Sequence, residues 1–160
     1  MAGRLDVAVL YNAGATPDGE IPPLGREELL LVQPAAGPPG GHADSADGTA
    51  PTAHATLAEL SQLPLVIPSR PNAIRMHVEG ALAQAGLSPT VAMEVDGIPS
   101  ILELVAGGAG CAVLSRQTVV SAQRPEAFRL RRLQAEGGAG LQIALFTAVS
   151  ARRPATRTQL

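Results

Sequence analysis

The residues best suited to chemistry in this chain follow a short apolar run at 65–67. Ser69 and Asn72 offer hydrogen-bonding groups there, and Arg70 adds a positive charge. Pro71 suits the first turn of a helix, because its fixed φ is helical and it has no N–H to satisfy. A helix that begins at the carboxyl end of a buried strand can bind a small anion with its free N–H groups. The stretch therefore predicts a ligand loop, in which Ser69 either caps the helix or contacts the ligand.

A second stretch repeats this arrangement at 90–100. An apolar run at 90–95 leads into a turn, and Pro99 again stands near the first position of an expected helix. We expect Ile98, Pro99 and Ser100 to form a second wall of the same site. The alternative is that these three residues only start a helix.

Catalytic and metal sites are not favoured. Ser100 lacks the second glycine of a Gly-x-Ser-x-Gly nucleophile elbow, and no general base can be inferred beside Cys111. His42 and His54 lie near two aspartates, but their spacing matches no known type of metal site. The sequence thus predicts no enzyme, no metal and no cofactor.

Composition excludes several classes of partner. Net charge is −2 with a pI of about 5.9, and only 2% of the 160 residues are aromatic. Neither a basic surface for DNA nor a stacking platform for single strands is expected. The single cysteine fits a reducing cytoplasm, and no apolar run approaches the roughly 20 residues that span a membrane.

Hydrophobic periodicity predicts an α/β chain with parallel strands around two helices. Ile74, Val78 and Leu82 repeat at helical spacing, Arg75 and Glu79 fall off that apolar face, and a glycine at 86 ends the helix. The Gly- and Pro-rich segment 34–56 is expected to be a flexible surface loop. Strands are expected at 3–11, 27–33, 65–67, 90–95, 110–114, 128–133 and 141–148, with a helical turn at 57–60 and a helix ending at 107–108.

Taken in order, six segments resemble the effector-binding domain of LysR-type transcriptional regulators. They are Leu-Asp-Val-Ala-Val at 5–9, Glu-Leu-Leu-Leu-Val at 28–32, Leu-Pro-Leu-Val-Ile-Pro-Ser at 63–69, Glu-Val-Asp-Gly-Ile-Pro-Ser-Ile-Leu at 94–102, Leu-Val-Ala-Gly-Gly-Ala-Gly-Cys-Ala-Val-Leu at 104–114, and Arg-Arg-Pro at 152–154. One departure is Ser115, where the family usually has proline.

This resemblance implies a type II periplasmic-binding-protein-like α/β fold, with two lobes and a hinge of crossing strands. Residues 1–30 and 125–160 would form part of lobe I, and 31–124 would form lobe II. The chain looks truncated at its N-terminus, so lobe I is expected to be incomplete, with exposed strand edges that favour association.

The resemblance also implies a function: sensing a small effector, expected to be an organic anion such as a carboxylate, in the interlobe cleft. Tyr11 and Asn12 would face the two loops from the other lobe. The implied site residues are Ser69, Arg70, Pro71, Asn72, Ile98, Pro99, Ser100, Tyr11 and Asn12.

Partners follow from the same resemblance. DNA would bind only through a helix-turn-helix absent from this chain, a homo-oligomer is expected, and the location would be cytoplasmic. The alternative is a stand-alone solute-binding protein of the same fold. The effector itself is not named by the sequence.

Overall fold

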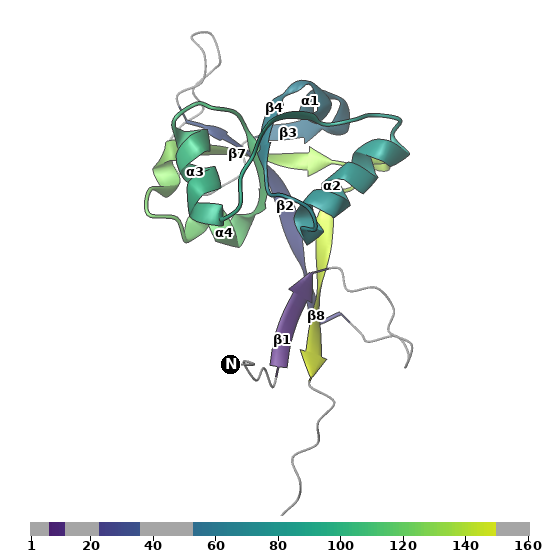
Figure 1. Ribbon diagram of the computed structural model, residues 1–160. Helices are drawn as coiled ribbons and strands as arrows, with labels where there is room; N and C mark the ends of the chain where they lie inside the picture. Colours follow the sequence, from purple (N-terminus) through teal and green to yellow (C-terminus); the bar gives the residue numbers. More distant parts are fainter. Residues whose placement is uncertain (1–6, 12–22, 36–52, 150–160) are drawn as a thin grey trace, which may run out of the picture.

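The computed structural model describes residues 7–11, 23–35 and 53–149, in which eight strands, four α-helices and two short 3-10 helices are found (Figure 1). The strands are β1 (Val7–Tyr11), β2 (Gly25–Pro34), β3 (Ala53–Thr56), β4 (Pro64–Ile67), β5 (Thr90–Glu94), β6 (Ala112–Ser115), β7 (Phe128–Gln134) and β8 (Gln142–Val149). The helices are α1 (Leu57–Gln62), α2 (Ala73–Gln84), α3 (Ile98–Ala106), α4 (Arg116–Val120), η1 (Pro125–Ala127) and η2 (Glu136–Gly138).

The central strand of the main sheet is β2. It pairs antiparallel with β6 on one side and with β7 on the other, so Leu30 lies opposite both Leu114 and Arg132. On the far side of β7, β3 adds in parallel. This strand order buries the middle of β2 completely, which explains its unbroken apolar run at Leu29–Val32.

Two backbone hydrogen bonds extend this sheet from β6 to β4. Val66 N–H donates to the Cys111 carbonyl and Cys111 N–H donates to the Pro64 carbonyl, both at 2.8 Å. Because β4 pairs in parallel with β5, the strands follow the order β3-β7-β2-β6-β4-β5. The expected parallel arrangement of strands around two helices is confirmed.

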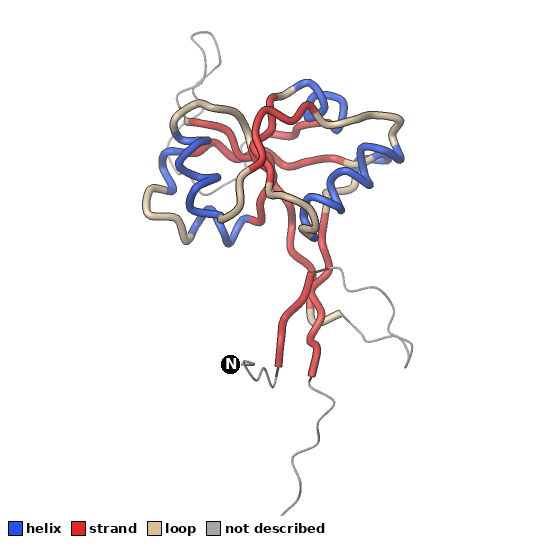
Figure 2. Tube along the Cα trace, in the orientation of Figure 1, coloured by secondary structure: helices blue, strands red, loops and turns tan. Residues whose placement is uncertain are grey.

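Helices cover both faces of this sheet (Figure 2). Leu29 and Leu31 of β2 pack in one apolar cluster with side chains of α1 and α2. Leu30 and Val32 point the other way and pack with side chains of α3 and α4. Alternate residues of each strand therefore supply two cores on opposite faces.

A narrower arm of strands extends from one end of the sheet. Residues 25–28 of β2 pair with β8, and β8 pairs on its other side with β1 (Figure 1). Ser115, the last residue of β6, lies opposite Leu29, where β2 passes from β6 toward β8. Since β4 and β5 run parallel to β6, their carboxyl ends lie at the same edge, which we call the arm-side edge.

Most expected elements are confirmed, and the structure also contains a strand and an α-helix that were not expected. Residues 53–56, placed at the end of the expected loop, form β3 instead, because they pair with β7 and lead into α1. The short helix α4 after Ser115 was not expected. Residues 36–52 of the expected loop lie outside the described residues, and the proposed lobe boundaries stay a prediction.

Candidate functional site

The loop between β4 and α2 lies at the arm-side edge, but its helix begins later than expected. The N-cap of α2 is Asn72, whose side-chain oxygen accepts a hydrogen bond from the Arg75 N–H at 3.1 Å. The prediction that Pro71 occupies the first helical turn, capped by Ser69, was therefore wrong. Pro71 precedes the cap and follows a cis peptide bond from Arg70. Asparagine is among the strongest N-cap residues, which explains the later start.

The end of α2 matches the expectation. Gly86 adopts a positive φ of 69°, and Leu87 N–H donates to the Leu82 carbonyl at 2.8 Å. This hydrogen-bond pattern is a Schellman motif, which favours glycine at that position.

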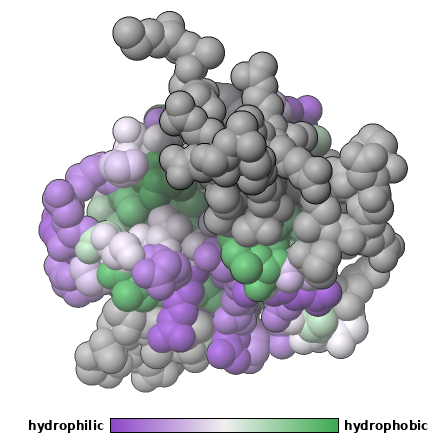
Figure 3. Space-filling model, turned by 90° about the horizontal axis from the view of Figure 1, so that it is seen from below, coloured by the Kyte–Doolittle hydropathy of each residue, from purple (hydrophilic) through white to green (hydrophobic). Residues whose placement is uncertain are grey.

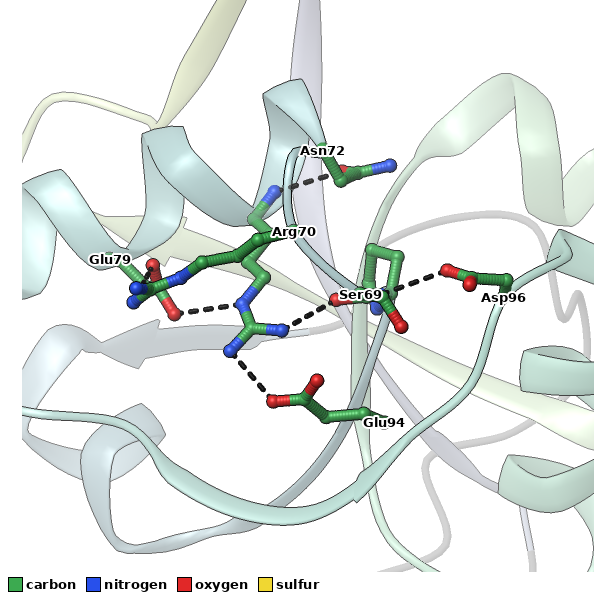
Figure 4. A network of polar contacts seen from close by, with 8 residues as sticks. Ser69, Arg70, Asn72, Glu79, Glu94 and Asp96 are labelled. Carbon is green, nitrogen blue, oxygen red and sulfur yellow. Dashed lines mark hydrogen bonds and ion pairs between the residues drawn. The ribbon is translucent and has the colours of Figure 1, made fainter.

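Arg75 is buried, although the helical pattern placed it off the apolar face. Its Nε contacts Glu79 Oε1, its Nη1 contacts the Pro68 carbonyl, and its Nη2 contacts Glu94 Oε1, each at 2.9 Å (Figure 4). Hydrogen bonds to Glu94 and Glu79 raise the pKa of Arg75 above its ordinary value. The helical pattern could not predict that Arg75 is buried, because two of its partners come from outside α2: one from a loop and one from a strand. The third lies on the next turn of α2.

Arg70 forms an ion pair with Glu79, its Nη2 lying 2.7 Å from Oε2. The Arg70 side chain is 62% exposed, whereas that of Glu79 is only 16% exposed. Burial alone would raise the pKa of Glu79, but hydrogen bonds from Arg75 and Arg70 outweigh it and hold the pKa below its usual value. The positive charge of Arg70 is therefore already engaged at this edge.

Ser69 connects the β4–α2 loop to the β5–α3 loop. Its backbone N–H donates to the Asp96 carboxylate at 3.0 Å (Figure 4). Just before this contact, Val95 N–H donates to the Ile67 carbonyl at 2.9 Å. The two predicted loops are thus adjacent, as the edge of a parallel sheet requires.

The first turn of α3 begins where expected. Gly97 is the N-cap with φ of 95°, a conformation that favours glycine, and no side chain caps this end. Ile98, Pro99 and Ser100 form the first turn and are all exposed. The backbone N–H groups of Ile98 and Ser100 and the positive end of the helix dipole stand at the arm-side edge.

A concave region of about 530 Å³ lies at this edge and contains residues that the sequence did not indicate. Its lining combines carboxylates, amide and hydroxyl groups, one arginine and an apolar side chain: Glu27, Glu28, Ser115, Arg116, Gln117 and Val120. Ser115 caps α4, since its Oγ accepts from the Thr118 N–H at 3.4 Å. The sequence could have indicated Ser115, because the strand that ends there was expected to be parallel to β4 and β5 and so to end at the same edge of the sheet.

Tyr11, on the arm, contacts one of the carboxylates that line this concave region. Its hydroxyl donates to Glu27 Oε2 at 3.2 Å, and burial together with the Glu27 charge raises the pKa of the phenol. Asn12 lies outside the described residues. Among the described residues, no hydrogen bond or ion pair joins Tyr11 to the loops at Ser69 or Ile98.

Apolar side chains are also exposed at the arm-side edge. Leu24, Ile98 and Val120 are 64%, 36% and 40% exposed, in segments that meet the arm-side edge. Seen from the side of the arm, hydrophobic surface shows inside a border of hydrophilic residues (Figure 3). Such a mixture suits a ligand with an apolar body and polar ends.

Other chemistry finds little support in the described residues. Cys111 is buried, burial raises the pKa of its thiol, and its sulfur contacts Gln33 Nε2 at 3.8 Å. No group of three or more His, Cys, Asp or Glu side chains within the described ranges could hold a metal ion. None of the helices in this part of the chain has the length and apolar character to cross a membrane.

A family model described as the LysR substrate binding domain matches residues 1–159. The chain belongs to this family. Its members are effector-sensing domains of transcriptional regulators, without enzymatic activity, and their fold is the type II periplasmic-binding-protein-like fold. No curated protein sequence matches the chain.

Solved structures share this fold. The effector-binding domain of QuiR in complex with shikimate matches with a TM-score of 0.67 and 15% identity, over 94% of this chain and 65% of that one. The C-terminal domain of a probable LysR family regulator from Rhodococcus sp. RHA1 has a TM-score of 0.66, 20% identity and coverages of 95% and 69%.

The reduced OxyR regulatory domain of Pseudomonas aeruginosa matches with a TM-score of 0.68 and 21% identity, over 94% of this chain and 66% of that one. The chain spans 48% of full-length CbnR in its complex with target DNA. It thus spans less than two thirds of several relatives, and at these identities the likeness shows the fold alone.

Proposed function

We propose that this chain senses a small organic anion, most simply a carboxylate, as the effector-binding part of a LysR-type regulator. The observation that carries the proposal is the meeting of the two predicted loops, joined by the Ser69–Asp96 hydrogen bond at the arm-side edge. The proposed contacts are those predicted from the sequence: Ser69, Arg70, Pro71, Asn72, Ile98, Pro99, Ser100, Tyr11 and Asn12.

The electrostatics of the two loops favour an anionic ligand, on the condition that Arg70 releases Glu79. The N-termini of α2 and α3 supply partial positive charge and N–H donors. Arg70 must exchange Glu79 for the ligand. Glu79 keeps its hydrogen bond from Arg75 Nε after this exchange, so its carboxylate is not left unpaired.

Fold relatives give this proposal a chemical precedent. QuiR is described in complex with shikimate and the CcmR regulatory domain of Synechocystis PCC6803 in complex with 2-PG. The exposed side chains of Ile98 and Tyr11 would contact the apolar part of a ligand. A polar anion with some carbon framework fits this combination.

The remaining features of the regulator extend the proposal. LysR-type regulators bind small-molecule effectors and DNA and act as oligomers, and full-length CbnR is described in complex with its target DNA. We place the present chain in such an oligomer in the cytoplasm, with DNA contacted by another part of the regulator. Lobe I would comprise residues 1–30 and 125–160, and lobe II residues 31–124.

Ligand-observed NMR with shikimate, benzoate and their methyl esters tests the proposal. We expect saturation transfer to a free carboxylate and little to its neutral ester. Arg70→Gln should lose this signal. Arg124→Gln is the matched control, because Arg124 is 58% exposed and pairs with Glu103 on α3. Equal signals from acids and esters, or from both variants, would contradict the anion site.

A further inference from the structure

Arg75 is the most fully engaged charged side chain of the candidate site. Its side chain is 7% exposed, and all three guanidinium nitrogens contact an acceptor. Such a planar group directs its hydrogen bonds in fixed directions, which a lysine ammonium does not do. The position of Arg75 therefore fixes the positions of its acceptors.

These acceptors belong to three different segments of the site. The Pro68 carbonyl immediately precedes Ser69 in the β4–α2 loop. Glu94 ends β5, two residues before Asp96, which receives the Ser69 N–H. Glu79 lies one turn further along α2 and also holds Arg70 (Figure 4).

We propose that Arg75 is the positioning residue of this site, holding both loops in the arrangement that binds the effector. Its contact with Pro68 sets the loop that carries Ser69 and Arg70. Its contact with Glu94 sets the loop that carries Asp96 and the start of α3. The inference rests on the proposed effector site, but its structural part is measurable without a ligand.

Two variants separate loop positioning from a general contribution to stability. Arg75→Lys keeps the positive charge near Glu79 and Glu94, but its single nitrogen cannot replace the three nitrogens that contact Glu79, Pro68 and Glu94. Glu94→Gln weakens only the contact to β5. A residue that merely stabilised the fold would alter the whole domain, whereas a positioning residue alters the two loops selectively.

The matched control is Arg131→Lys. Arg131 also contacts a glutamate, Glu59, at 3.1 Å, and it donates to the backbone carbonyl of His54. These contacts join β7 to β3 and α1, away from the β4–α2 and β5–α3 loops. The control therefore removes the same kind of interaction without touching the site.

Amide hydrogen exchange by NMR on the full chain gives the first readout. In Arg75→Lys we expect the Ser69 and Val95 amides to exchange at least about tenfold faster, while the core amides of β2 keep their rates. In Glu94→Gln, Val95 should be the more affected of the two. Arg131→Lys should leave both unchanged. Unchanged loop amides in Arg75→Lys, or an equal increase across the whole chain, would overturn the proposal.

Benzoate titration gives the second readout. Weaker binding by at least about tenfold in Arg75→Lys, with wild-type affinity in Arg131→Lys, supports Arg75 as a positioning residue. Equal affinity in both variants overturns it. If wild type binds no carboxylate, the anion proposal fails, and selective loop exchange in Arg75→Lys still decides whether Arg75 positions the loops.

Discussion

Glu79 contacts two arginines with one carboxylate, and this contact depends on pH. Its folded pKa is lowered, so its contribution to stability is complete above the unfolded pKa of about 4.3 and is lost as the pH falls through the folded pKa. Glu94 has a lowered pKa for the same reason, since Arg75 donates to it. Both carboxylates therefore lose their contribution at acid pH.

We expect Glu79→Gln to flatten the acid limb of the stability profile. Urea unfolding between about pH 6 and pH 3 should show a steeper loss of unfolding free energy in wild type than in the variant. Glu103→Gln is the control, because the Glu103 side chain is 71% exposed and contacts Arg124 only at 3.4 Å. Parallel profiles for wild type and Glu79→Gln would show that its ion pairs do not persist in solution.

At the residue scale, sequence could place the loops but not the contacts within them. The apolar runs and prolines located Ser69 and Ile98 at strand ends, and the structure brings their loops together. Arg75 was missed because an amphipathic pattern records which residues are polar, not whether distant acceptors will pair with them. Its partner Glu94 lies 19 residues further along the chain, on β5.

At the scale of elements, the close approach of β4 and β6 depends on Gly110. A Cβ atom there would lie 2.5 Å from the Pro64 carbonyl oxygen, which accepts the Cys111 N–H. We expect Gly110→Ala to lower the unfolding free energy by about 1–3 kcal/mol, because the two strands must separate.

The control for that prediction lies in α2. Gly80 is exposed, and a Cβ added to it meets nothing within 4 Å. Gly80→Ala should raise the unfolding free energy by about 0.5–1 kcal/mol, because alanine is the better helix former. Urea unfolding of both variants measures this difference. A neutral or stabilising Gly110→Ala would mean that β4 and β6 are not held this closely.

Element types followed from periodicity, whereas pairing did not. A buried run such as Leu29–Val32 predicts a strand, but nothing in it shows that β2 pairs with three other strands. β3 was missed because its four residues, Ala53–Thr56, lie at the end of a Gly- and Pro-rich segment and carry little apolar pattern. The pairing with β7 outweighs that weak local preference.

At the scale of the whole molecule, the arm and the main sheet share one strand, β2. β2 pairs with β6 and β7 in one half and with β8 in the other, and β8 continues to pair with β1. The hydrogen bond from Tyr11 to Glu27 therefore joins β1 to β2 across β8. This contact links the arm to the concave region at the arm-side edge.

The chain has one tyrosine and no tryptophan, so near-ultraviolet absorbance reports the ionisation of Tyr11 alone. Because burial and Glu27 raise the phenol pKa, we expect a titration midpoint above the ordinary value of about 10. The stability from this contact is present below that ordinary value and lost as the pH rises through the folded pKa.

Glu27→Gln should lower the midpoint of the Tyr11 titration, although burial keeps part of the shift. Glu28→Gln is the control, since Glu28 contacts Arg132 at 3.3 Å instead, and its midpoint should match wild type. An unchanged midpoint in Glu27→Gln would show that β1 is not held against β2 in solution.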